Sequence, residues 1–184
     1  MTSKKEHIIS ATAELIHAKG YESTKLSDIL KAADIGKGQF YHYFSSKKDL
    51  GISVVDQYVQ TWEQNLIEAI LQSDKPSTDK LNEMLDWAVS YHESIGEFHG
   101  CPFGNLALEM SEHDEIFRTK INALFEKWIR SLENVLEDIV GGEKALMQAQ
   151  AIVAQLEGGI LLMKNFQDLS ILRNIAENIR AQYI

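Results

Sequence analysis

The sequence is poor in cysteine and proline, and both shortages limit what the protein can be. The single cysteine, Cys101, excludes a disulfide within the chain and is typical of a reducing compartment. The two prolines, Pro76 and Pro102, leave long stretches without a helix breaker, and 45% of the residues are hydrophobic. No uninterrupted apolar run reaches membrane-spanning length, and the N-terminal MTSKKEHIIS lacks a signal-peptide core. These absences predict a cytoplasmic, mainly helical protein that does not enter a membrane.

The formal net charge of −9 at first argues against nucleic-acid binding, because phosphate contacts need positive charge. The charge is unevenly distributed, however. Residues 1–50 contain eight basic and six acidic residues, a net of +2, whereas residues 51–184 contain ten and twenty-one, a net of −11. This asymmetry favours a small DNA-binding part attached to an acidic body.

Two short helical patterns flank a break at Asp34-Ile35-Gly36. The first follows Thr24, which is the expected N-cap. The second runs only from about residue 37 to residue 43, with Phe40 and Phe44 on the face that packs inward. A helix of two turns needs tertiary support. This arrangement is typical of a helix-turn-helix, in which one helix braces a second that enters the major groove of DNA.

A long amphipathic helix is predicted directly afterwards, from Lys47 to Leu71. Ser46 is its expected N-cap, with Asp49 in the capping-box position. A helix N-terminus that carries lysines suits a phosphate. Because the helix begins beside the DNA-binding part and ends in the body, it is the expected mechanical connection between them.

At these residues the chain resembles a known family. The run YESTKLSDILKAADIGKGQFYHYFSSKKDL is similar to the DNA-binding domain of TetR-family transcriptional regulators, most specifically through GKGQFYHYFSSKKDL. The close resemblance covers roughly residues 5–52, and the rest matches only in helical layout. It implies an all-α fold, in which an N-terminal three-helix helix-turn-helix domain (residues 1–46) is joined by a long helix to a larger helical ligand-binding and dimerisation domain (residues 47–184).

The resemblance also implies which side chains face DNA. Tyr41 and Lys47 would contact phosphates, and Gln39 and His42 would read bases. Ser27 stands where the family often has a longer arginine. The predicted DNA-binding set is Thr24, Ser27, Lys37, Gly38, Gln39, Tyr41, His42, Tyr43 and Lys47. Without the resemblance, an ordinary helical hairpin with core aromatics would explain these residues equally well.

The body contains further amphipathic helices and no strand-like alternation. The helix over about residues 143–165 is apolar on most faces, so it must be covered on more than one side. It is either the central helix of a monomer or a helix covered by a partner subunit. The resemblance implies a homodimer through the last two helices, which would read a pseudo-palindromic operator.

A repressor of this kind implies a small-molecule inducer, which must bind two conformations of the body unequally. We expect a mostly apolar or aromatic molecule, with Tyr91, His92 or Glu109 as polar anchors. The predicted ligand-binding set is Trp62, Met84, Trp87, Tyr91, His92, Glu109, Met110, Phe117 and Trp128. Core packing is the competing interpretation for each of these residues.

Cys101 supports an alternative. Its segment GCPFGNLALE resembles one found in several TetR-type regulators, some of which sense oxidants or electrophiles through a cysteine. A thiol near a helix N-terminus and His99 could react as the thiolate, whereas a buried, inert cysteine is the competing interpretation. The spacing of His92, His99, Cys101 and His113 matches no zinc pattern, so neither a metal nor another cofactor is expected.

An enzyme and a helical interaction module are the competing classes. An enzyme would need a nucleophile with a base or clustered carboxylates, and Cys101 with His99 lacks a third member. An interaction module would leave the polar residues of 37–47 unexplained. We therefore predict a DNA-binding regulator without enzymatic activity, a repressor rather than an activator.

Overall fold

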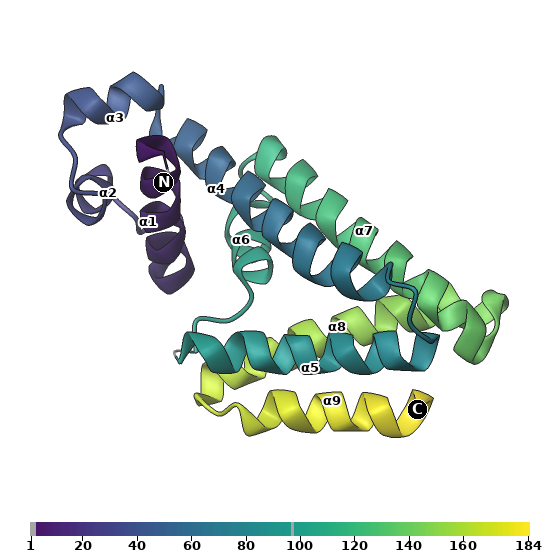
Figure 1. Ribbon diagram of the computed structural model, residues 1–184. Coiled ribbons are helices and arrows are strands. Elements are labelled where there is room, and N and C mark those ends of the chain that lie inside the picture. The colour runs from purple at the N-terminus through teal and green to yellow at the C-terminus, as the bar shows by residue number, and fades with distance from the viewer. Residues whose placement is uncertain (1–2, 97) are drawn as a thin grey trace. The chain divides into compact units, whose positions relative to one another are not determined.

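The computed structural model describes residues 3–96 and 98–184, which form nine α-helices and one π-helical segment and include no β-strand (Figure 1). The predicted all-α fold is therefore confirmed. The helices group into two compact units: unit 1 runs to Gln60 and includes Pro102–Asn122, and unit 2 contains Thr61–Cys101 and Ala123–Ile184. These units interleave along the chain, so they do not test the domain boundary expected after residue 46, which stays a prediction.

Unit 1 is built around the first three helices. These are α1 (Lys4–Lys19), α2 (Leu26–Ala32) and α3 (Lys37–Tyr43), joined by the first parts of α4 (Lys47–Trp62) and α7 (Glu115–Val140) and by all of α6 (Pro102–Met110). A capping box starts α1, because Ser3 Oγ accepts from the Glu6 amide at 3.2 Å while the Glu6 carboxylate accepts from the Ser3 amide at 2.6 Å. Phe40 and Phe44 are buried, as predicted.

The start of α2 differs from the prediction. Thr24 was expected as its N-cap, but the helix begins at Leu26, and Asp28 accepts a hydrogen bond from the Lys25 amide at 3.1 Å. The Thr24 hydroxyl instead donates to the carbonyl oxygen of Gly20 at 2.7 Å, and the whole side chain is buried. The hydroxyl is therefore used within the turn before the helix.

The predicted connecting helix from Lys47 to Leu71 is present. Ser46 Oγ accepts from the Asp49 amide at 3.1 Å, which confirms the expected cap. α4 continues directly into wider π-helical turns over Glu63–Leu71, labelled η1. One helical run therefore belongs to unit 1 as far as residue 60 and to unit 2 from residue 61.

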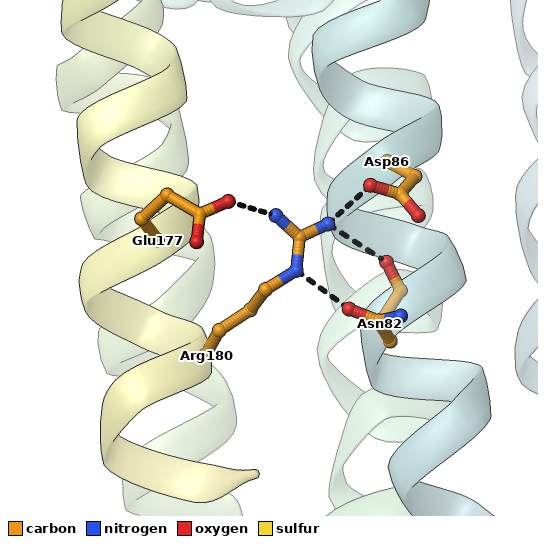
Figure 2. Close-up of polar contacts among 4 residues, drawn as sticks. All are labelled: Asn82, Asp86, Glu177 and Arg180. Atoms are coloured by element: carbon orange, nitrogen blue, oxygen red, sulfur yellow. Dashed lines mark hydrogen bonds and ion pairs between the residues drawn. The ribbon is translucent and has the colours of Figure 1, made fainter.

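Unit 2 contains η1, α5 (Ser77–Ile95), the rest of α7, α8 (Gly142–Phe166) and α9 (Ser170–Tyr183). α9 packs against both α8 and α5. Figure 2 shows how Arg180 of α9 links to α5: its Nε donates to Asn82 Oδ1 at 2.5 Å, and its guanidinium also pairs with Asp86 and with Glu177. The guanidinium thus fixes α9 against α5 through Asn82 and Asp86, whereas its pair with Glu177 lies within α9 itself.

Helix α8 is the broadly apolar helix that the sequence predicted. By length and composition alone it could cross a membrane, and only 39% of its most apolar window is buried. A core helix passes the same test, and α8 buries Ile152, Leu156 and Met163 within unit 2. Other apolar side chains of α8 are exposed, among them Met147, Leu161, Leu162 and Phe166.

Candidate DNA-binding and ligand-binding sites

The outer face of α3 is polar and exposed. Lys37, Gln39 and His42 are exposed, and so is the ring of Tyr41, which is 57% accessible. The inner face carries the buried Phe40, so packing of that ring fixes which way the polar side chains point. A two-turn helix that presents lysine, glutamine and histidine from a buried apolar base has the donors and acceptors that read base edges.

Three other predicted DNA contacts lie on the elements around α3. Ser27 is exposed on α2. Lys47, at the start of α4, has its Nζ 4.3 Å from the centre of the Tyr21 ring and 3.4 Å from the carbonyl oxygen of Glu22. Thr24 is completely buried, so we leave it out of the DNA-binding surface.

The neighbouring lysine is engaged elsewhere. Lys48 Nζ lies 2.5 Å from Asp114 Oδ2 at the start of α7. The hydrogen bond from Lys48 lowers the pKa of the Asp114 carboxyl below its ordinary value. Of the two lysines at this helix start, only Lys47 is without a carboxylate partner among the ion pairs of the described residues.

Glu109 was expected to anchor a ligand, but the structure gives it another partner. Its Oε2 accepts from the Tyr21 amide and its Oε1 from the Glu22 amide, both at 2.8 Å. These two amides lie in the turn that joins α1 to α2. Because both carboxylate oxygens already accept hydrogen bonds within unit 1, Glu109 holds this turn on α6 and is not placed as a ligand anchor.

The predicted ligand-binding residues divide between the two units. Met110 and Phe117 lie buried in unit 1 with Glu109, where Phe117 contacts the Tyr21 ring at 5.0 Å between centroids. The other predicted residues lie in unit 2. There, Trp128 Nε1 lies 3.4 Å from the sulfur of the buried Met84.

Three rings and a histidine in unit 2 form what we call the aromatic cluster: Trp62, Trp87, Tyr91 and His92. Trp62 meets Trp87 edge-on at 5.0 Å and Tyr91 at 4.8 Å, whereas Trp87 and Tyr91 are stacked at 5.6 Å. His92 is buried against Tyr91 at 5.1 Å. These contacts bring Trp62 against Trp87 and Tyr91 of α5, which also carries His92, and the role of all four in ligand binding stays a prediction.

Sequence reasoning did not single out Glu157 of α8. Burial raises the pKa of this carboxyl above its ordinary value, while a hydrogen bond with Cys101 acts in the opposite direction. Cys101 itself is buried. The only signal in the sequence was one acid among the small and apolar residues of QLEGGI, which is also the pattern of an acid on a solvated helix face.

A surface groove of about 380 Å³ lies in unit 1 and is lined by α1 and α4. The residues that line it include Lys5, Glu6, Ser53 and Asp56. None of the predicted ligand-binding residues lines this groove, so it does not bear on the aromatic cluster.

In a comparison with known proteins, an N-terminal and a C-terminal part of the chain each match a described protein family. Residues 8–54 match the family described as "Bacterial regulatory proteins, tetR family", and residues 77–178 match the "Transcriptional regulator LmrA/YxaF-like, C-terminal domain". An uncharacterised helix-turn-helix transcriptional regulator from the lacX 3′ region of Lactococcus lactis is 38% identical over 185 residues, which cover 100% of this chain and 94% of that protein.

Solved structures share the whole fold. A TetR transcriptional regulator from Legionella pneumophila superposes with a TM-score of 0.86 at 25% identity, over 100% of this chain and 99% of that one. The reduced form of Escherichia coli NemR, a protein described as a transcriptional repressor, gives a TM-score of 0.83 at 26% identity over 98% of each chain.

The exposed polar helix of a helix-turn-helix therefore defines a DNA-binding transcriptional regulator. More specifically, the chain belongs to the TetR family. Members of this family bind operator DNA, dimerise, typically respond to small molecules and are generally not enzymes.

Proposed function

We propose that the protein is a homodimeric repressor that leaves a pseudo-palindromic operator when a small apolar or aromatic inducer binds in unit 2. The observation that carries this proposal is the exposed polar face of α3 above its buried phenylalanines. Gln39 and His42 read base edges from this face, while Lys37, Tyr41 and Lys47 contact phosphates. Ser27, Gly38 and Tyr43 complete the surface.

The inducer is held by the aromatic cluster together with Met84 and Trp128, with Tyr91 and His92 as polar anchors. Large apolar and aromatic side chains with a few polar atoms are the usual lining of small-molecule sites. Ligand binding at Trp62 can affect DNA binding, because Trp62 ends α4 and the same helix begins at Lys47. A ligand that shifts this run changes the spacing of the two DNA-binding heads in the dimer.

The dimer forms through α8 and α9. The supporting observation is the row of exposed apolar side chains on α8, including Leu162 and Phe166, the second of which is 65% accessible. Covering such a row with a second copy of the chain removes apolar surface from water and so stabilises a dimer. Two-fold symmetry of the dimer requires a two-fold symmetric operator. As a DNA-binding regulator, the protein acts in the cytoplasm.

A repressor that senses oxidants or electrophiles through Cys101 is the second proposal. Its support is the position of Cys101 directly before α6 and the likeness to a repressor whose structure is described as a reduced form. Burial and the adjacent Glu157 oppose it, because a carboxylate disfavours the thiolate that must react. A Cys101→Ser protein that still releases DNA normally after electrophile treatment would exclude this route.

Selection from random double-stranded DNA, followed by fluorescence anisotropy on the selected duplex, tests the main proposal. We expect a two-fold symmetric site whose affinity falls with salt. Lys37→Ala should weaken binding to all sequences and reduce the slope of log K against log salt by about 1. Gln39→Ala should instead relax the preference at particular base pairs. A folded dimer that selects no sequence would refute the proposed function.

A further inference from the structure

The turn between α6 and α7 places a carboxylate beside the start of α4. Asp114 Oδ2 lies 2.5 Å from Lys48 Nζ, and both residues belong to unit 1. The carboxylate is fixed by α7, because its Oδ1 accepts from the Ile116 amide at 3.0 Å and from the Phe117 amide at 3.4 Å. Only 13% of the Asp114 side chain is exposed, compared with 47% of the Lys48 side chain. Asp114 is therefore a fixed acceptor for a lysine that reaches it from the surface.

Lys47 and Lys48 are adjacent but differ in what holds them. Lys47, the proposed phosphate contact, lies against the Tyr21 ring and the Glu22 carbonyl oxygen, and no ion pair of the described residues gives it a carboxylate. Neither the ring nor the carbonyl neutralises its charge, so the ammonium stays available to a phosphate. The charge of Lys48 is already matched by Asp114. Only one of the two lysines therefore presents an uncompensated charge to DNA.

Both lysines lie in the first turn of α4. The backbone amides and the dipole of a helix start also attract anions, so a phosphate that meets Lys47 is drawn to this turn. A lysine carries its charge on a flexible stem of four carbons. Lys48 can therefore exchange Asp114 for a phosphate beside this helix start by rotation of its side chain alone.

We propose that Lys48 is a further phosphate contact and that Asp114 competes with the DNA backbone for it. The inference rests on the proposed function, because it requires the start of α4 to meet DNA. While Asp114 holds Lys48, the protein makes one phosphate contact fewer and binds every sequence more weakly. Asp114 acts through Lys48, so it is a positioning residue that sets the affinity for DNA as a whole and not the preference for particular base pairs.

The surroundings of the pair favour Asp114 in this competition. Salt weakens phosphate contacts, because the binding of a lysine to DNA releases counterions that must return to a more concentrated solution. A partly buried ion pair is screened much less. The Lys48–Asp114 pair, with its largely enclosed carboxylate, therefore persists at ionic strengths at which phosphate contacts weaken.

Fluorescence anisotropy of the full-length protein on the selected duplex, at several salt concentrations, tests the inference. Asp114→Asn removes the charge but keeps a helix cap, since asparagine caps as well as aspartate. The released Lys48 should steepen the slope of log K against log salt by about 0.9 and raise the affinity at low salt by at least about threefold. Asp114→Ser, which also keeps a cap, should give the same result.

Two controls separate the release of Lys48 from a general change in charge. Glu112→Gln removes one negative charge from an exposed position two residues earlier and should leave the slope close to that of the wild type. Lys48→Gln combined with Asp114→Asn should restore the wild-type slope, because the pair and its double replacement have the same net charge. Circular dichroism confirms that each variant is folded.

Three results would each overturn the inference. The first is an unchanged slope in both Asp114→Asn and Asp114→Ser. The second is a steeper slope that survives the loss of Lys48, because the effect would then not act through this lysine. The third is an equal steepening in Glu112→Gln, which would reduce the role of Asp114 to that of any nearby negative charge.

The outcome is separable from the proposed function. Phosphate contacts carry no sequence information, so the gain in affinity should be equal on the selected duplex and on an unrelated one. If the wild type selects a sequence but the Asp114 variants leave the slope unchanged, the repressor stands and the role of Asp114 fails. If no sequence is selected, the proposed function is refuted, and the slopes on the unrelated duplex still decide whether Lys48 is released.

Discussion

Glu109 Oε2 accepts a hydrogen bond from the backbone amide of Tyr21 at 2.8 Å, although the two residues are 88 positions apart in the sequence. The other carboxylate oxygen accepts from the next amide at the same distance. α6 is thereby fastened to the turn that leads into the helix-turn-helix. Gly20 has no side chain, and this leaves space for the Glu109 carboxylate, because a Cβ at Gly20 would lie 3.0 Å from Glu109 Oε1.

Removing the two hydrogen bonds that Glu109 accepts should lower the stability of unit 1. Glu109→Ala loses two hydrogen bonds to a charged acceptor at a partly exposed site, so we expect the free energy of unfolding to fall by about 1–2 kcal/mol. Urea denaturation followed by circular dichroism measures it. Glu112→Ala, at an exposed position just beyond the same helix, should change stability by less than about 0.5 kcal/mol. Equal effects of the two substitutions would show that the clamp contributes little.

Gly51 should not tolerate a side chain. A Cβ at this position of α4 would lie 2.5 Å from Tyr21 Cε2 and 3.0 Å from Phe117 Cζ, and both rings are buried. Gly51→Ala should therefore destabilise the protein by about 1–3 kcal/mol through overpacking. Gly38→Ala is the matched control, since nothing lies within 4 Å of its Cβ and alanine should gain about 0.5–1 kcal/mol in a helix. Thermal unfolding of both variants decides the point, and a stabilised Gly51→Ala would contradict the packing described.

The buried carboxyl of Glu157 should make stability depend on pH. Burial raises its pKa, so the folded chain holds this proton more tightly than the unfolded chain. The free energy of unfolding should consequently fall as pH rises from the ordinary value of about 4.5 through the raised one.

Glu157→Gln should remove that contribution. It should match the wild type near pH 4 and exceed it at neutral pH, as judged by urea denaturation at several pH values. The exposed Glu68→Gln should keep the wild-type slope. If Glu157→Gln were less stable than the wild type at neutral pH, the carboxyl would be well paired there, against the structure.

The exposed apolar row on α8 should be needed for dimerisation. Phe166→Asp places a charge in the proposed interface, and burying an unpaired charge is costly, so the variant should elute as a folded monomer. Size-exclusion chromatography with light scattering gives the mass. Leu108→Asp, at an 81% exposed leucine of α6 outside the last two helices, should remain dimeric. If the Phe166→Asp variant remained dimeric, the interface would lie elsewhere on the protein.

The sequence alone determined the local elements and the class of the protein. Helical periodicity, the cap at Ser46 and the short polar helix over residues 37–43 depend on neighbours within a few positions, so they are visible in the chain. The aromatic-rich string around that helix was specific enough to identify the family.

Only the tertiary structure decided which of the singled-out residues meet. Thr24 was expected to cap a helix, but its hydroxyl donates a hydrogen bond to the carbonyl oxygen of Gly20. Glu109 was expected to anchor a ligand, but its carboxylate accepts hydrogen bonds from two backbone amides that are distant in the sequence. Glu157 was not singled out, because a helix pattern does not reveal what packs against a given face. Long-range contacts set burial, and burial decides whether a carboxyl is a solvated charge or a group with a raised pKa.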